Sequence, residues 1–309
     1  MTIASEIIDL QTNLAAAKAA VTTKGGTVGD TGLAGLASEI ATIPSGGSLA
    51  NYGSITYLDA NNVEQTLTLA TEDDYLELTV GQASTIEIEV NGVTMTKGDI
   101  TGVVIADGVQ YIPNNFCNGC SNLTTATIPS SVHIIGENVF LSCNITTASL
   151  DLQNVHQIGG GFLQYSSNFD SSISLPKVRE IGNGFLMNCS SFNSSLIIND
   201  SCEVIGSSFL RNCTAFAQSF SIPSGLSMNV GLTNPGDRFM QECKNFVGPL
   251  VCNCPTTSMA ITSNVLSTND ATAPLYATGV TLTGTYANDW KTTFQDRDSS
   301  PYRKLIVGA

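Results

Sequence analysis

Short stretches in which apolar and polar residues alternate recur along the chain between about residues 100 and 255. The alternating stretches are Ala126-Thr-Ile128, Leu150-Asp-Leu152, Ile173-Ser-Leu175, Leu196-Ile-Ile198, Phe220-Ser-Ile222 and Leu250-Val-Cys252. A period of two over three to five residues is typical of a half-buried strand. Pro129, Pro176 and Pro223 follow three of the stretches, where a missing N–H does little harm. The pattern therefore predicts a series of short strands that share one apolar core.

A second motif lies between these strands and repeats with an almost constant length. Its copies are Ile112-Pro-Asn-Asn-Phe116-Cys-Asn-Gly-Cys120, Ile135-Gly-Glu-Asn-Val139-Phe-Leu-Ser-Cys143, Ile158-Gly-Gly-Gly-Phe162, Ile181-Gly-Asn-Gly-Phe185-Leu-Met-Asn-Cys189 and Ile205-Gly-Ser-Ser-Phe209-Leu-Arg-Asn-Cys213. Successive isoleucines are 23, 23, 23 and 24 residues apart, and a looser copy is Phe239-Met-Gln-Glu-Cys243. A unit this short cannot bury its own apolar face, so the repeat predicts stacked coils about 4.8 Å apart, which is a solenoid.

Other repeat positions are apolar as well. Val109, Val132, Val155 and Val178 precede the isoleucines on a predicted second strand and should point inward. The positions three residues after the cysteine position are Leu123, Phe169, Phe192, Phe216 and Phe246, with Ile145 one place early. These residues complete a continuous apolar interior.

Most of the nine cysteines fit the same repeat. Cys120, Cys143, Cys189, Cys213 and Cys243 share one position, and Cys252 takes the strand position of Ile222. Because a free cysteine behaves as a small hydrophobe, we expect this set to pack as a buried ladder. Disulfides between adjacent coils and a metal site at Cys117-x-x-Cys120 remain alternatives.

The repeat resembles the leucine-rich repeats of the BspA type over about residues 100–255, and it departs from them at Ser166 and in the insertion around Gly225–Gly236. The resemblance implies a mostly β fold with short helices, built as a leucine-rich-repeat solenoid. We divide the chain into a helical docking segment (1–46), a small antiparallel β-module (47–98), the solenoid (99–262) and a C-terminal cap (263–309).

The N-terminal segment has a helical pattern. Apolar residues with heptad-like spacing are Ile3, Ile7, Leu10 and Leu14, followed after Gly25-Gly26 by Leu33, Leu36 and Ile40. Ser45-Gly46-Gly47-Ser48 has the composition of a flexible linker. We interpret residues 1–46 as a docking and oligomerisation segment, with a trimer favoured; a helical hairpin packed on the rest of the protein is the alternative.

The same segment is similar to N-terminal segments of structural proteins of tailed phages and prophages. The residues that carry the similarity are Ala4-Ser5-Glu6-Ile7, Lys24-Gly-Gly-Thr-Val28 and Leu36-Ala-Ser-Glu-Ile40-Ala-Thr-Ile43. The resemblance implies attachment to other virion proteins and a place on the virion surface.

Two regions flank the repeats. Residues 51–98 alternate strongly, which predicts strands near 55–58, 66–69, 76–80 and 86–90, with turns at Asp59–Asn62 and at Asn91-Gly92. Their acidic residues should face solvent; a Ca²⁺ site is the alternative. Near the C-terminus we expect a helix over Tyr286–Gln295 and a strand at Leu305–Val307, which together close the solenoid, whereas an exposed aromatic patch around Trp290 is the alternative.

Charge narrows the classes of partner. The chain has 12 Lys and Arg against 26 Asp and Glu, a net charge of −14 and a sequence pI near 4.3. Binding to nucleic acid or to an anionic membrane requires clustered bases, so we expect neither. The sequence contains neither an apolar run of roughly 18 residues nor a recognisable signal peptide, so we expect synthesis in a host cytoplasm without membrane insertion.

The repeat places a column of polar residues outside the core. Tyr111, His133, His156, Arg179 and Glu203 belong to it, and the two histidines, 23 residues apart, should be neighbours on adjacent coils. We interpret this column as a binding surface for a cell-surface glycan or protein. A zinc ion held by the two histidines and an ordinary solvated sheet face are the alternatives.

The sequence lacks the motifs of a nucleophilic triad and of a phosphate or dinucleotide site, although paired carboxylates for glycoside hydrolysis stay open. We therefore expect no enzyme, cofactor or metal. The leading hypothesis is a phage fibre or receptor-binding protein that uses many weak contacts for host attachment. A head fibre or decoration protein without a receptor and a bacterial BspA-like surface adhesin are the alternatives.

Overall fold

The computed structural model describes residues 49–226, 238–246, 248–258, 280–296 and 306–307. The chain divides into two compact units, Met1–Ala50 and Asn51–Ala309. The predicted N-terminal helices, with Ile3, Ile7, Leu10, Leu14, Leu33, Leu36 and Ile40, lie outside the described residues. The description that follows therefore concerns the second unit.

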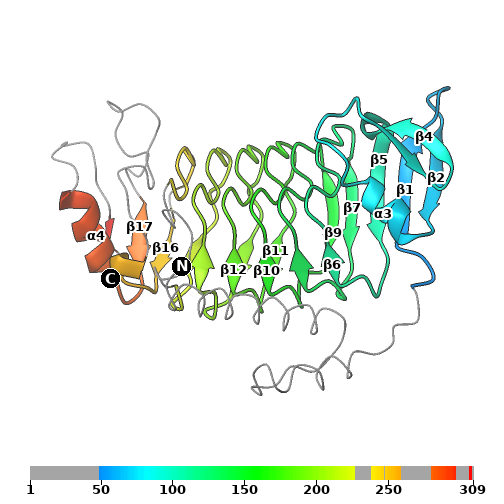
Figure 1. Cartoon of the computed structure of the whole chain (residues 1–309). Coiled ribbons are helices and arrows are strands. Elements are labelled where there is room, and N and C mark those ends of the chain that lie inside the picture. Colours follow the sequence, from blue (N-terminus) through cyan, green and yellow to red (C-terminus); the bar gives the residue numbers. More distant parts are fainter. Residues whose placement is uncertain (1–48, 227–237, 247, 259–279, 297–305, 308–309) are drawn as a thin grey trace, which may run out of the picture. The chain divides into compact units, whose positions relative to one another are not determined.

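The repeats wind into a solenoid of coils that turn at about 23-residue intervals, as predicted (Figure 1). One wall is a parallel sheet of two-residue strands, with the order β14-β12-β10-β8-β6. Its strands are β6 (Tyr111–Ile112), β8 (Ile134–Ile135), β10 (Gln157–Ile158), β12 (Glu180–Ile181) and β14 (Val204–Ile205). The predicted inward residues Val109, Val132, Val155 and Val178 are buried beside this wall.

The second wall consists of the longer alternating strands. Three of its parallel strands are β5 (Ile100–Ile105), β7 (Thr125–Ile128) and β9 (Thr147–Leu150). Further along lie the pair β11 (Ile173–Leu175) and β13 (Leu196–Ile198), and then the parallel set β15 (Phe220–Ile222), β16 (Leu250–Cys252), β17 (Thr281–Thr283) and β18 (Ile306–Val307).

One strand is displaced from its predicted place. The stretch Leu150-Asp-Leu152 was expected to form the strand, but β9 ends at Leu150, which pairs with Ile128. The N–H of Asp151 still donates to the carbonyl of Ile128, and Leu152 is buried. The preceding strand β7 sets this register, and the alternation in the sequence cannot reveal it.

Tight turns close each coil on the remaining side. In each of the six repeat copies between residues 112 and 243, three alternate residues have positive φ; they include Asn115, Cys117 and Gly119 in the first copy and Gly184, Leu186 and Asn188 in the fourth. Residues other than glycine lose about 1 kcal/mol or more in this conformation. Hydrogen bonds between coils help to offset that loss, since the N–H of Leu186 donates to the carbonyl of Phe162 over 3.1 Å.

The Ile-Gly word of the motif has a steric cause. A Cβ at Gly159 would lie 2.5 Å from the carbonyl carbon of Gly136, and one at Gly182 would lie 2.4 Å from the backbone nitrogen of Gly160. Adjacent coils approach so closely at this turn that a side chain does not fit. The glycine therefore sets the contact between coils.

The interior contains two aromatic columns. Phe162, Phe185, Phe209 and Phe239 form one, with ring centroids 5.9, 5.4 and 5.2 Å apart in sequence along the column. Phe169, Phe192, Phe216 and Phe246 form the other, at 5.9, 5.5 and 5.8 Å. Phe239 and Phe246 belong to the looser sixth copy, which therefore continues the stack as predicted.

The cysteines form the predicted ladder, and all nine are buried free thiols. The thiol of Cys189 donates to the carbonyl of Leu163 over 3.1 Å, and that of Cys213 donates to the carbonyl of Leu186 over 3.0 Å. Ser166, where the motif lacks its cysteine, donates its hydroxyl to the carbonyl of Phe140 over 3.2 Å. The departure at Ser166 thus preserves the same hydrogen bond.

The N-terminal module shares a sheet with the solenoid. Strands β1 (Gly53–Leu58) and β2 (Glu64–Leu69) extend the sheet in the order β2-β1-β5-β7-β9, and β1 pairs antiparallel with both neighbours. The boundary predicted at residue 98 therefore falls next to β5, within one sheet. Strands β3 (Glu87–Val90) and β4 (Val93–Thr96) form a hairpin through the predicted Asn91-Gly92 turn.

The strand predicted over 76–80 is wrong, because α3 (Glu72–Glu77) occupies its first part. Thr71 and Asp74 form a reciprocal capping box, and this local signal outweighs the alternation that follows. The ring of Tyr75 from this helix packs against that of Phe116, with centroids 4.7 Å apart and planes tilted by 40°, and so covers the first coil.

Lys97, the first residue of the 3₁₀ helix η1 (Lys97–Asp99), is fully buried. Its ammonium donates to the carbonyls of Leu78, Val80 and Gly81 at 3.3, 3.1 and 3.2 Å. These are carbonyls that follow α3 and lack a helical partner. The lysine therefore fixes the segment 78–81, which follows α3, at the first coil of the solenoid.

At the other end the predicted helix is present as α4 (Ala287–Asp296), after the 3₁₀ helix η2 (Thr256–Ser258) and β17. Trp290 is fully buried, and its Nε1–H donates to the carbonyl of Cys254 over 2.8 Å. An exposed aromatic patch around Trp290 is therefore wrong, because this ring packs against the last coils. Residues 263–279, 297–305 and 308–309 of the predicted cap lie outside the described residues.

Candidate functional site

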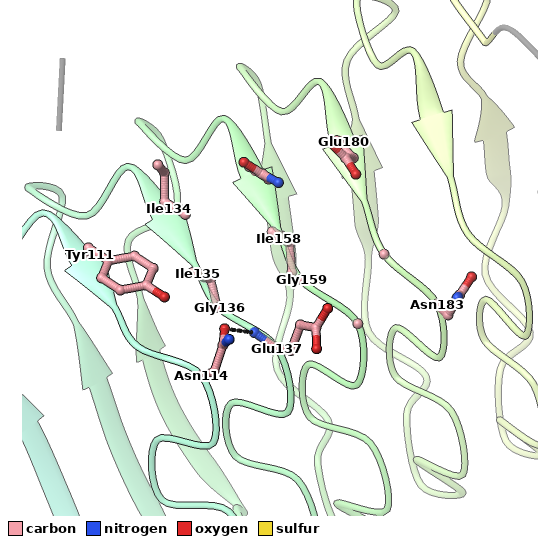
Figure 2. A pocket seen from close by; sticks show the side chains of 13 residues that line it. Tyr111, Asn114, Ile134, Ile135, Gly136, Glu137, Ile158, Gly159, Glu180 and Asn183 are labelled. Atoms are coloured by element: carbon pink, nitrogen blue, oxygen red, sulfur yellow. Dashed lines mark hydrogen bonds between the residues drawn. The ribbon is translucent and has the colours of Figure 1, made fainter. Parts of the chain in front are cut away.

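A shallow groove of about 280 Å³ runs across four coils on the wall of short strands. Four residues in register, Tyr111, Ile134, Gln157 and Glu180, border one side (Figure 2). Each comes one residue before the buried isoleucine of its strand, so its side chain points away from the core. The groove is thus built from one repeat position with a different side chain on each coil.

The glycines that let the coils approach one another form the floor. Gly136, Gly159 and Gly182 all line the groove, together with the backbone of Ile135 and Ile158. Because these positions lack side chains, backbone lies open at the bottom of the groove. The constraint that stacks the coils therefore also creates the hollow.

Asn114, Glu137 and Asn183 border the other side (Figure 2). The Oδ1 of Asn114 accepts from the N–H of Glu137 over 2.8 Å, and that of Asn183 accepts from the N–H of Ser207 over 2.8 Å. Both asparagines are therefore fixed by the following coil. Burial raises the pKa of Glu180 on the opposite side above its ordinary value.

A second line of polar residues lies one position before the groove on each strand. His133 and His156 are neighbours as predicted, with ring centroids 5.7 Å apart and ring planes 16° apart. Arg179 and Glu203 continue the line, and backbone hydrogen bonds of 2.8 Å join each residue to the preceding one. We call His133, His156, Arg179 and Glu203 the edge line.

The imidazoles of the edge line have different surroundings. The Nδ1 of His133 lies 2.6 Å from the carbonyl of Ser131, which leaves Nε2 for other partners. The pKa of His156 is below its ordinary value because its ring is partly desolvated and because His133, Lys177 and Arg179 lie nearby. The ammonium of Lys177 donates to the Oδ1 of Asn154 over 2.6 Å.

The predicted site residues thus fall on two adjoining lines. Tyr111 is 40% exposed and borders the groove, whereas His133, His156, Arg179 and Glu203 form the edge line. The predicted site did not include Asn114, Glu137 and Asn183. Their signal was a polar column two residues after each isoleucine position, interrupted by Gly160. The binding role of all these residues remains a prediction.

The groove offers amide, carboxylate, phenol and backbone groups for hydrogen bonds and one aromatic face for stacking. Within the described ranges, three or more metal-ligating side chains do not gather at any point. A helix long and apolar enough to cross a bilayer is likewise missing from the residues that the structure describes.

The repeats match a known family. Residues 92–227 match, in six copies, the model of the BspA type leucine-rich repeat region, so the chain carries a leucine-rich-repeat domain of this type. Among solved structures, the leucine-rich repeat protein of T. pallidum is similar, with 19% identity, 60% of this chain and 83% of that chain covered, and a TM-score of 0.38. No curated protein matches the sequence.

Proposed function

We propose that the protein is an attachment protein whose leucine-rich-repeat domain binds a host cell-surface glycan or protein. The observation that carries this proposal is the groove, in which each coil contributes a different exposed side chain to one continuous row. Solenoids suit this task because successive coils build an extended, rigid surface. The groove is shallow and polar, as expected of a surface that holds an extended ligand.

We further propose that residues 1–46 dock the protein, as a homo-oligomer with a trimer favoured, to other proteins of a phage virion. The support is the similarity of Ala4–Ile7, Lys24–Val28 and Leu36–Ile43 to segments of phage structural proteins. Many copies on one particle would turn weak contacts in the groove into firm attachment. A bacterial surface adhesin is the second candidate, which the match to the BspA type repeat favours.

Binding of the labelled full chain to candidate host cells tests the attachment role. We expect the parent to show saturable binding. A double variant, Tyr111→Ala with Gln157→Ala, removes two side chains from the groove and should bind at least fivefold more weakly. Thr127→Ala, on the other wall, is the matched control and should bind as the parent does. Equal binding by all three proteins, or none by the parent across a panel of hosts, would refute the role.

Electron microscopy of virions labelled with an antibody against the repeat domain tests the location. Label at regular positions on the particle is expected, and deletion of residues 1–46 should remove it. Label on the envelope of uninfected bacteria instead would favour the adhesin.

A further inference from the structure

We propose that the three basic residues of the edge line, together with Lys177, form a subsite for the carboxylate groups of an acidic polysaccharide. The inference rests on the proposed attachment role and narrows its ligand. It concerns His133, His156 and Arg179, which occupy one repeat position on three consecutive coils.

The backbone fixes the spacing of these groups. The N–H of His156 donates to the carbonyl of His133, and the N–H of Arg179 donates to the carbonyl of His156, each over 2.8 Å. Neighbouring strands lie about 4.8 Å apart, so the three side chains form a regular row. A polymer with charges at regular intervals fits such a row better than a single small anion does.

The charges in this row are unexpected in so acidic a chain. The net charge is −14, yet His156 lies near Lys177, Arg179 and the other histidine of the chain, His133. Like charges at close range destabilise each other. Within the described part of the chain Arg179 and Lys177 form no ion pair that would relieve this, and Glu203 follows only at the end of the row.

A bound carboxylate would relieve this repulsion. Arg179 is exposed and presents a planar guanidinium, which binds a carboxylate with two parallel hydrogen bonds. Lys177 adds a point charge, and His133 keeps Nε2 available because its Nδ1 contacts the carbonyl of Ser131. Glu137 lies across the groove, four residues further along the chain, where it would direct an anionic ligand toward the edge line.

His156 makes the subsite sensitive to pH. The groups that face His156 are His133, Lys177 and Arg179, and with burial they keep its ring neutral near pH 7. Protonation of His156 as the solution becomes more acidic, toward pH 5.5, adds positive charge to the row. A carboxylate with an ordinary pKa near 4 stays ionised there. Affinity should therefore rise as the pH falls from 7.5 to 5.5.

Titration calorimetry with the full chain tests the subsite. The probes are polygalacturonate, hyaluronate and polysialate, with dextran as the neutral polymer, each at pH 7.5 and 5.5. We expect binding of at least one acidic polymer to be tenfold or more tighter than that of dextran, with a further gain of threefold or more at pH 5.5.

Matched variants assign the effect. Arg179→Gln should lower affinity for the acidic polymer at least tenfold at both pH values, whereas His156→Gln should abolish the gain at pH 5.5. Lys291→Gln, which removes a cation on α4, should change neither. Equal affinity for dextran and all acidic polymers, or variants that behave as the parent, would overturn the subsite.

The same measurements separate this inference from the attachment role. If cells bind the chain through the groove but acidic polymers bind no better than dextran, only the subsite is refuted. If neither cells nor any polymer binds, both the attachment role and the subsite are refuted.

Discussion

The two walls of the solenoid share an interior but differ on their outward sides. On the sheet β2-β1-β5-β7-β9, the outward rows in register are Thr66, Thr56, Gly102, Thr125 and Thr147, and Thr68, Ser54, Val104, Thr127 and Ser149. These rows are uncharged and almost uniform. The corresponding row of the short strands is Tyr111, Ile134, Gln157, Glu180 and Val204, which differs on every coil and ends at Val204, whose side chain is buried.

This difference separates what the fold requires from what recognition requires. Either row satisfies the alternation that buries Ile and Val beneath it, so stability alone does not demand five different side chains on the short strands. A uniform row of hydroxyl groups gives a partner few distinguishing contacts, whereas a row of different side chains can select one partner over another. The comparison therefore places specificity on the wall of short strands.

The largest expected effect is a loss of folding stability at alkaline pH, which arises in the interior that both walls share. Burial raises the pKa of seven cysteine thiols, among them Cys202 to about 12 and Cys254 to about 11. Thiols in the unfolded chain ionise above about pH 8.5, so each contributes stability that is full below that pH and declines above it by up to about 1.4 kcal/mol per pH unit. Urea unfolding under reducing conditions should show a steep loss between pH 8.5 and 10.

Cys254→Ser is the control for this prediction, since it removes one titrating thiol and should lessen the slope with pH. A free energy of unfolding that stays constant up to pH 10 would contradict burial of the ladder.

Removal of one ring from the shared core comes next. Phe185 is fully buried and stacks between Phe162 and Phe209, so Phe185→Ala should lower the free energy of unfolding by about 3–5 kcal/mol. Denaturant titration followed by circular dichroism measures this. A change near zero would place the ring outside the core.

A substitution in the floor of the groove should lower the free energy of unfolding less than the loss of a core ring does, but it should also weaken ligand binding. Gly159→Ala forces a Cβ to within 2.5 Å of the backbone of Gly136, so we expect a loss of about 1–3 kcal/mol together with weakened ligand binding. Gly160→Ala is the matched control, because its Cβ would meet the Asn183 carbonyl oxygen at 3.2 Å. Equal losses in thermal unfolding for the two variants would show that the coils do not meet at Gly159.

The smallest effect should come from the uniform wall. Thr125→Val preserves the shape of an exposed β-branched residue, so we expect a change within about 0.5 kcal/mol and unaltered binding to cells. Gln157→Ala on the other wall should be equally mild for stability but should reduce binding. If Thr125→Val reduces binding as much as Gln157→Ala does, the two walls do not differ in function.

The repeat could be predicted from sequence because each coil presents the same constraint. The words Ile135-Gly136 and Ile158-Gly159 mark both the buried strand end and the close contact that follows it. The Phe and Cys columns follow from the same spacing.

The errors arose where no repeat enforced the local pattern. Leu76–Val80 alternates like a strand, yet the capping box of Thr71 and Asp74 starts a helix just before it. In β9 the pairing with β7 decides where the strand ends. The groove border at Asn114 and Asn183 escaped prediction because turn residues carry no periodic apolar signal.

The coupling of each coil only to its neighbours has a genetic consequence. The carbonyls of Phe140, Leu163 and Leu186, which accept from the hydroxyl of Ser166 and the thiols of Cys189 and Cys213, each belong to the immediately preceding coil. A tandem duplication of one 23-residue unit would therefore find its partners already in place. Such an event would lengthen the rod by one rung and add one new side chain to the groove, so recombination within the gene could extend and diversify the surface while both ends stay unchanged.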